Sequence, residues 1–261
     1  MKKKFLLLLV VLSITTLSSC LKIKNEYAPV GEVNFKMIES LAPGARYLIC
    51  EFSTEEQFGC LNYLIRYDYT SNMGNFEIHL KDVEKSDFCL TAPGPAKAEL
   101  NLGTYQNGDY VVKIKVGDIE NQGMLKVSAQ HYVLDISTLQ NLTIVTDTLL
   151  RMPEHTIWGY ASYQDDQFET PAIAFTDSLE QRGAQPANLP AGDFGYFTIG
   201  QNSQIVSIIN APEEKAIYFI YRFVDGDNAI MDLVSDFFVT YSNDIIIIVY
   251  TSEGQTFSSF S

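Results

Sequence analysis

The stretch NYLIRYDYTSNMGNFEIHL, residues 62–80, decides the fold. Apolar and aromatic side chains alternate with polar ones on both sides of residues 71–74, which read Ser-Asn-Met-Gly. A period of two places one set of side chains inward in a β-strand, and Asn and Gly favour a turn between strands. The stretch therefore predicts two strands joined by a turn, with Tyr63, Tyr67 and Tyr69 facing a core.

The same alternation returns further along the chain. Residues 110–116 alternate apolar side chains with lysines, directly after the turn-forming pair Asn107-Gly108. Two more short strands are indicated at residues 124–129 and 132–136. Short strands at close spacing with turn residues between them predict an antiparallel β-sandwich over residues 31–138.

The pattern changes after a soft boundary near residue 138. Strands still dominate, but helical spacing is indicated at residues 176–182 and again at residues 230–241. The apolar run Ile245 to Tyr250 predicts a buried strand. The fold class expected is mainly β: an N-terminal β-sandwich followed by a β-rich α+β domain over residues 139–261.

Part of the sandwich resembles a known kind of module. Residues 98–136 contain Leu100-Asn101-Leu102-Gly103, then Asn107-Gly108-Asp109-Tyr110, then Leu125-Lys126-Val127. This series resembles the last strands of immunoglobulin-like modules in bacterial surface proteins. The resemblance implies an immunoglobulin-like β-sandwich and nothing about chemistry.

The N-terminus has the layout of a secretory signal peptide. Three lysines at positions 2–4 precede an apolar run, and small polar residues follow it. The sequence Leu17-Ser18-Ser19-Cys20 resembles the lipobox of bacterial lipoproteins. The resemblance implies that residues 1–19 are removed, that Cys20 carries a lipid as the membrane anchor, and that the protein lies in the cell envelope, at the outer membrane, on its periplasmic or surface face. Residues 20–30 are then expected to be a tether.

As a whole, the chain resembles exported lipoproteins of Bacteroidota-type bacteria that carry an immunoglobulin-like domain and have no assigned function.

The net negative charge of the chain agrees with an acidic protein that is held at the membrane by its lipid. The 261 residues include 18 basic and 32 acidic ones, and removal of the leader would take away three lysines and no acidic residue. Binding of nucleic acid requires a positive surface, so nucleic acid is not an expected partner.

The cysteines beyond Cys20 predict at most one disulfide. Cys60 and Cys89 lie at the edges of neighbouring strand-like runs, which favours a bond between them, while a Cys50–Cys60 bond and no bond at all remain alternatives. A zinc site is disfavoured because the chain has no C-x-x-C and its histidines are scattered. No metal and no cofactor is expected.

Two stretches invite a ligand-binding interpretation. Trp158 and Tyr160 share one face of a predicted strand, where aromatic rings can stack on sugars; the alternative is that they belong to the core. Residues 225–228, Asp-Gly-Asp-Asn, suggest calcium, but the ligand spacing of an EF-hand is absent, and a turn that caps the following helix is favoured.

No catalytic motif is present, and none of the histidines His79, His131 and His155 stands in a pattern that singles it out. No catalytic residue is therefore assigned. The sequence predicts a non-enzymatic envelope protein that binds or scaffolds, with a glycan or another envelope protein as partner. A carbohydrate-active hydrolase of the envelope and a structural subunit of a surface assembly are the alternatives.

Overall fold

The computed structural model describes residues 27–86, 88–212, 215–224, 227–241 and 244–259. The predicted signal peptide and Cys20, the predicted site of lipid attachment, lie outside these residues. The tether predicted at residues 20–30 reaches into them and is partly wrong. Tyr27–Pro29 form strand β1, which pairs with β5, and Val30 is buried.

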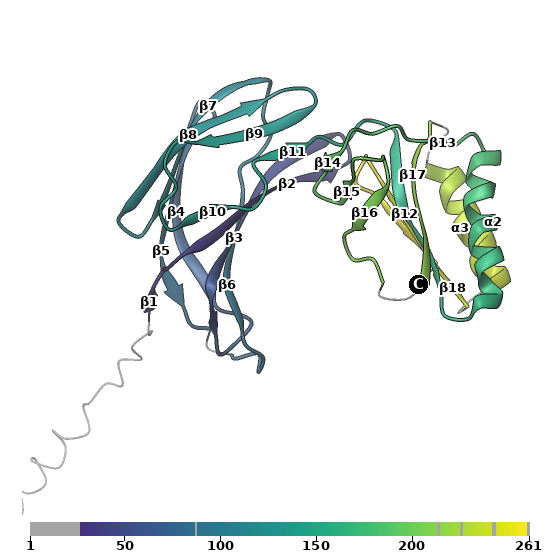
Figure 1. Ribbon diagram of the computed structural model, residues 1–261, viewed down its shortest axis with the longest axis horizontal. Helices are drawn as coiled ribbons and strands as arrows, with labels where there is room; N and C mark the ends of the chain where they lie inside the picture. The colour runs from purple at the N-terminus through teal and green to yellow at the C-terminus, as the bar shows by residue number, and fades with distance from the viewer. Residues whose placement is uncertain (1–26, 87, 213–214, 225–226, 242–243, 260–261) are drawn as a thin grey trace, which may run out of the picture.

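The described residues form two lobes (Figure 1). The N-terminal lobe, residues 27–150, contains only strands. Its strands are β1 (Tyr27–Pro29), β2 (Val33–Ala42), β3 (Ala45–Phe58), β4 (Leu64–Asn72), β5 (Asn75–Glu84), β6 (Gly94–Asn101), β7 (Gly108–Val116), β8 (Ile119–Val127), β9 (His131–Ile136), β10 (Leu142–Ile144) and β11 (Thr148–Leu150).

One continuous sheet builds this lobe around a single hydrophobic core. The strands are hydrogen-bonded in the order β10-β2-β3-β6-β4-β5-β7-β8-β9-β11, and most neighbours are antiparallel. Alternate residues of each strand enter the core, as Phe76, Ile78 and Leu80 do on β5. The predicted period of two is therefore confirmed, and the chain is mainly β.

The predicted boundary at residue 138 comes too early. Strand β10 pairs in parallel with β2, with Leu142 opposite Val33. Strand β11 pairs antiparallel with β9. Both strands therefore belong to the N-terminal lobe, and the chain leaves that lobe only after Leu150.

The C-terminal lobe, residues 154–259, has a second sheet with helices on one face. Its elements are β12 (Thr156–Tyr163), the 3₁₀ turn η1 (Asp166–Phe168), α2 (Glu169–Gln181), β13 (Gln185–Pro186), β14 (Gly192–Asp193), β15 (Phe197–Ile199), β16 (Ile205–Ile208), β17 (Lys215–Arg222), α3 (Asp227–Tyr241), β18 (Ile245–Thr251) and β19 (Thr256–Ser258). The sheet order is β13-β17-β12-β18-β19.

The central strand β12 is buried on both faces. Helices α2 and α3 pack on one face, and β15 and β16 lie on the other (Figure 1). Strands β14, β15 and β16 continue the first sheet through a pairing of β14 with β11. The two lobes thus share backbone hydrogen bonds.

Both predicted helices exist, with different starts. Helix α2 begins at Glu169, seven residues before the predicted start at Thr176, whose hydroxyl donates to the carbonyl of Ile173 inside the helix. Gly183, with φ of +99°, follows its end. Within the described residues, the helices fall short of the length and apolar character that a membrane crossing requires.

Candidate functional site

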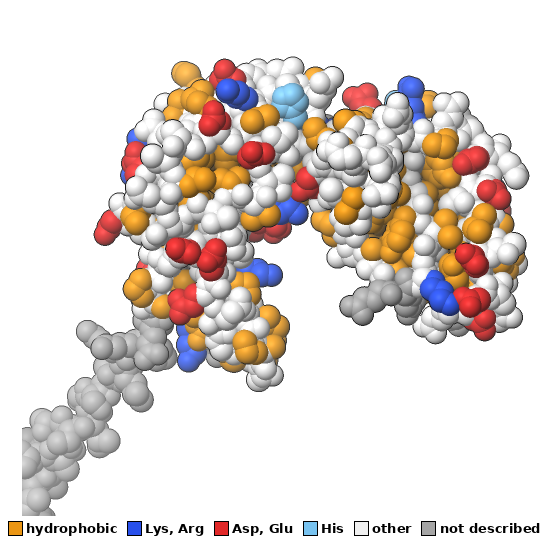
Figure 2. Space-filling model, viewed as in Figure 1, with side chains coloured by type: hydrophobic (Ala, Val, Ile, Leu, Met, Phe, Trp, Pro, Cys, Tyr) orange, Lys and Arg blue, Asp and Glu red, His pale blue; other side chains and the backbone are white. Residues whose placement is uncertain are grey.

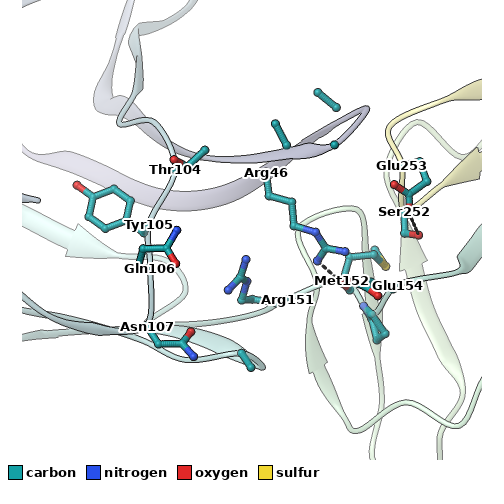
Figure 3. A pocket seen from close by; sticks show the side chains of 15 residues that line it. Arg46, Thr104, Tyr105, Gln106, Asn107, Arg151, Met152, Glu154, Ser252 and Glu253 are labelled. Atoms are coloured by element: carbon teal, nitrogen blue, oxygen red, sulfur yellow. Dashed lines mark hydrogen bonds between the residues drawn. The ribbon is translucent and has the colours of Figure 1, made fainter.

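A cleft of about 810 Å³ lies at the junction of the lobes. Five segments from distant parts of the sequence line it: the β2–β3 hairpin, the loop before β7, the turn between β8 and β9, the linker between the lobes and the turn between β18 and β19 (Figure 3). Figure 2 shows the lobes as separate bodies joined by a narrower waist. The residues that line the cleft are Ala42, Gly44, Ala45, Arg46, Thr104, Tyr105, Gln106, Asn107, Ala129, Arg151, Met152, Pro153, Glu154, Ser252 and Glu253.

A buried carboxylate organises the base of the cleft. Glu39 is fully buried at the junction end of β2. Its Oε1 accepts hydrogen bonds from Tyr132 Oη at 3.1 Å and Arg151 Nε at 2.9 Å. Its Oε2 accepts from the backbone N–H of Met152 at 3.1 Å and from Arg46 Nη1 at 3.4 Å. Four donors on one carboxylate offset the cost of removing its charge from water.

The same group of residues fixes the linker between the lobes. The carbonyl of Met152 accepts a hydrogen bond from Arg46 Nη1, so both backbone groups of Met152 bind residues of the N-terminal lobe. The guanidinium of Arg151 lies over the ring of Tyr132 at 5.0 Å and donates to the carbonyl of Ser128 at 3.1 Å. Burial, with a smaller contribution from the charge of Glu39, raises the pKa of Tyr132 and keeps its hydroxyl a donor.

Two further contacts join the lobes at Leu41. Its N–H donates to Tyr196 Oη at 3.1 Å. Burial raises the pKa of Tyr196, whose ring also packs on Trp158. On the other side, Gly254 approaches so closely that a Cβ atom there would lie 2.3 Å from the carbonyl oxygen of Leu41. Only glycine permits this approach, so the junction is a packed contact.

Both arginines have N–H groups that remain available to a ligand in the cleft. The side chains of Arg46 and Arg151 are 22% and 16% exposed. A guanidinium has five N–H groups, and Nη2 of each arginine, with Nε of Arg46, has no hydrogen-bond partner among the described residues. In Figure 3 the two side chains extend into the cleft from the hairpin and from the linker.

The structure joins Cys60 and Cys89, the pair that the sequence favoured, through a disulfide. The bond connects the segment before β4 with the loop that precedes β6. Cys50 is free and buried, and burial raises the pKa of its thiol well above the usual value. The disulfide lies away from the residues that line the cleft.

The predicted sugar-stacking pair is wrong as a surface site, because both side chains belong to a core. Trp158 is 2% exposed and lies against Tyr196, Phe197 and Tyr250. Tyr160 is also buried, and its hydroxyl donates to the carbonyl of Asn210. Strand β12 has both faces covered, so alternation along it does not indicate exposure.

The remaining sequence candidates are not brought together. His79 hydrogen-bonds the carbonyl of Gly117 at the far turn of the N-terminal lobe. Of the calcium candidate at residues 225–228, the first two residues lie outside the described part of the chain. Elsewhere in the described part, no three His, Cys, Asp or Glu side chains gather as metal ligands would.

Sequence reasoning missed Glu39, although a signal for it exists. Val33, Phe35 and Met37 occupy inward positions of β2, and Glu39 continues the same series. A carboxylate at an inward position requires a partner, and Arg46 follows across the hairpin. The second arginine, 112 positions away, has no such signal.

The chain matches no protein-family model, no curated protein and no solved structure. What the cleft can bind is therefore inferred from the residues that line it.

Proposed function

We propose that this protein is a lipid-anchored component of the bacterial cell envelope that binds a ligand without transforming it, and that the ligand occupies the cleft between the lobes. The leader at residues 1–19 and the lipobox that ends at Cys20 support the anchor. The acidic balance of the chain supports a body that is held by its lipid and not by attraction to anionic headgroups.

The observation that carries the binding proposal is the way the cleft is held. A buried carboxylate with four donors lies behind its base and holds Arg46 and Arg151 there, and its walls come from both lobes. A cleft whose polar groups are already fixed binds with less loss of conformational freedom than a mobile one. A volume of about 810 Å³ is in the range of pockets that bury small ligands.

The surface of the cleft favours a polar ligand. Its exposed side chains include Thr104, Gln106 and Asn107, which offer hydroxyl and amide groups. Such groups suit a glycan, or a polar segment of another envelope protein. The large apolar side chains of the lining, Tyr105 and Met152, are both buried and offer little surface to a ligand.

The test addresses both lipid attachment at Cys20 and ligand binding in the cleft. The full chain, produced in a bacterium supplied with labelled palmitate, should incorporate the label, and Cys20→Ala should not. The purified chain is then screened against glycan and peptide arrays. The variant Asn107→Trp fills the cleft and should remove the main signal, whereas Gln57→Trp, which adds the same ring at the far end of β3, should keep it.

Two results would overturn the proposal. One is an unacylated product that still carries Met1. The other is a screen in which Asn107→Trp leaves every signal unchanged, or in which a bound glycan is recovered cleaved.

A further inference from the structure

Building on the proposed function, we infer that the ligand of the cleft is a saccharide that bears a carboxylate, and that Arg46 and Arg151 bind that carboxylate. The inference rests on a positive site in an otherwise acidic molecule. The chain has 32 acidic and 18 basic residues, yet two arginines meet at the base of this cleft.

The charges at the base do not cancel. Glu39 supplies one negative charge and the two arginines supply two positive ones, all joined by hydrogen bonds. One positive charge therefore remains at the base, although Glu154 and Glu253 elsewhere in the lining make the cleft as a whole negative. The positive charge lies in a partly buried position, where salt screens it less than on an open surface.

The geometry of the donors matches an anion with two oxygens. Arg46 offers Nε and Nη2, which form one edge of its planar fork, and Arg151 offers Nη2. A guanidinium binds a carboxylate with two parallel hydrogen bonds. Glu39 already holds both side chains, and the carbonyls of Met152 and Ser128 hold Arg46 and Arg151 respectively, so little rotamer freedom is lost when the anion binds.

The rest of the wall favours a sugar as the carrier of the carboxylate. Thr104, Gln106 and Asn107 lie beside the arginines (Figure 3) and suit neutral hydroxyl groups. Glu154 and Glu253, both exposed, also line the cleft and would repel further negative charge. The ligand therefore has a single carboxylate at the arginines and hydroxyl groups elsewhere in the cleft.

The binding test uses the full chain in detergent and titration calorimetry. The acidic probe is a disaccharide of galactose and glucuronic acid, the neutral probe is the corresponding galactose–glucose disaccharide, and a tripeptide with a free C-terminus is the third. The acidic disaccharide should bind at least tenfold more tightly than the neutral one, because charge-assisted hydrogen bonds are about twice as strong as neutral ones. Its affinity should fall as salt is raised.

Variants on opposite walls should act in opposite directions. Glu253→Gln removes repulsion and should strengthen binding of the acidic disaccharide about two- to threefold, as expected for an exposed charge. Asn107→Ala should weaken it about fivefold, the usual effect of one hydrogen bond. Glu56→Gln, at the far end of the strand that carries Arg46, is the matched control and should change nothing.

Arg46→Lys keeps the charge that Glu39 needs but removes the fork, and it should weaken binding about tenfold while the melting temperature stays close to that of the parent. Equal binding of the acidic and neutral disaccharides would overturn the inference and leave the proposed function intact. Preference for the tripeptide, or no binding of the acidic disaccharide, would also overturn it. An array screen in which Asn107→Trp removes no signal would overturn the proposed function separately.

Discussion

The carboxylate of Glu39 accepts a hydrogen bond at 2.9 Å from Nε of Arg151, a residue 112 positions further along the chain. Glu39 lies on the second strand of the first lobe, and Arg151 begins the linker to the second. The pair sets the path of the chain as it leaves the first lobe. Arg151 also lines the cleft, so stability and the proposed binding depend on the same guanidinium.

Arg151→Ala should destabilise the protein strongly. Removing the guanidinium leaves the buried carboxylate of Glu39 with one cationic partner at 3.4 Å, and breaking a buried ion pair from one side costs about 3–5 kcal/mol. Urea unfolding measures the loss. Arg222→Ala, at an exposed position of β17, should stay within about 0.5 kcal/mol of the parent. Equal unfolding midpoints for both variants would mean that Glu39 does not depend on Arg151.

Gly254→Ala should loosen the contact between the lobes. The residue has φ of +78°, and a Cβ atom would lie 2.3 Å from the carbonyl oxygen of Leu41. Gly44→Ala is the matched control, since Gly44 has φ of +71° with no atom within 4 Å of its Cβ position. Both variants carry the left-handed strain of about 1–2 kcal/mol, and only Gly254→Ala adds a collision.

Hydrogen exchange at the N–H of Leu41, which donates to Tyr196, reports on that contact. Exchange should speed up in Gly254→Ala and remain slow in Gly44→Ala. Equal rates in the two variants would show that the turn between β18 and β19 does not hold the lobes together.

The sequence predicts the strands well because alternation is a local property. It predicts less well which face of the sheet each side chain lies on. The pairing of β4 with β5 shifts between Arg66 and Tyr67, and Tyr67, expected in the core, is 36% exposed and donates to the carbonyl of Glu99. No feature of the alternation marks where such a shift occurs.

The cleft was beyond sequence reasoning for a related physical reason. Its residues come from five separate segments, and the linker among them is placed by the return of β11 to the first lobe. The predicted boundary near residue 138 assigned those strands to the wrong domain. Trp158 illustrates the same difficulty, because whether an aromatic face is exposed depends on β15 and β16, which lie later in the chain.

Removing the disulfide should destabilise the N-terminal lobe. Cys60 and Cys89 are 29 positions apart, and closing a loop of that length in the unfolded chain corresponds to about 3–4 kcal/mol. Cys60→Ser with Cys89→Ser, compared with the parent in urea, measures the loss. Adding a reductant should lower the stability of the parent and leave that of the double variant unchanged. A reductant effect of equal size on both proteins would assign the loss to something other than this bond.

Alkaline pH should weaken the second lobe through Tyr221. Its hydroxyl donates to Glu180 Oε1 at 3.0 Å, and burial, reinforced by this hydrogen bond and the nearby carboxylate, raises its pKa from 10.0 to about 12. Between these two pH values the unfolded chain releases a proton that the folded chain keeps, so stability is fully present below pH 10 and falls as pH rises toward 12. The slope of stability against pH reports the number of protons released on unfolding. In Tyr221→Phe this number should be smaller by up to about one in the same window. Urea midpoints at several pH values, followed together with tyrosinate absorbance, measure both effects, and parallel profiles for parent and variant would contradict a buried, late-ionising Tyr221.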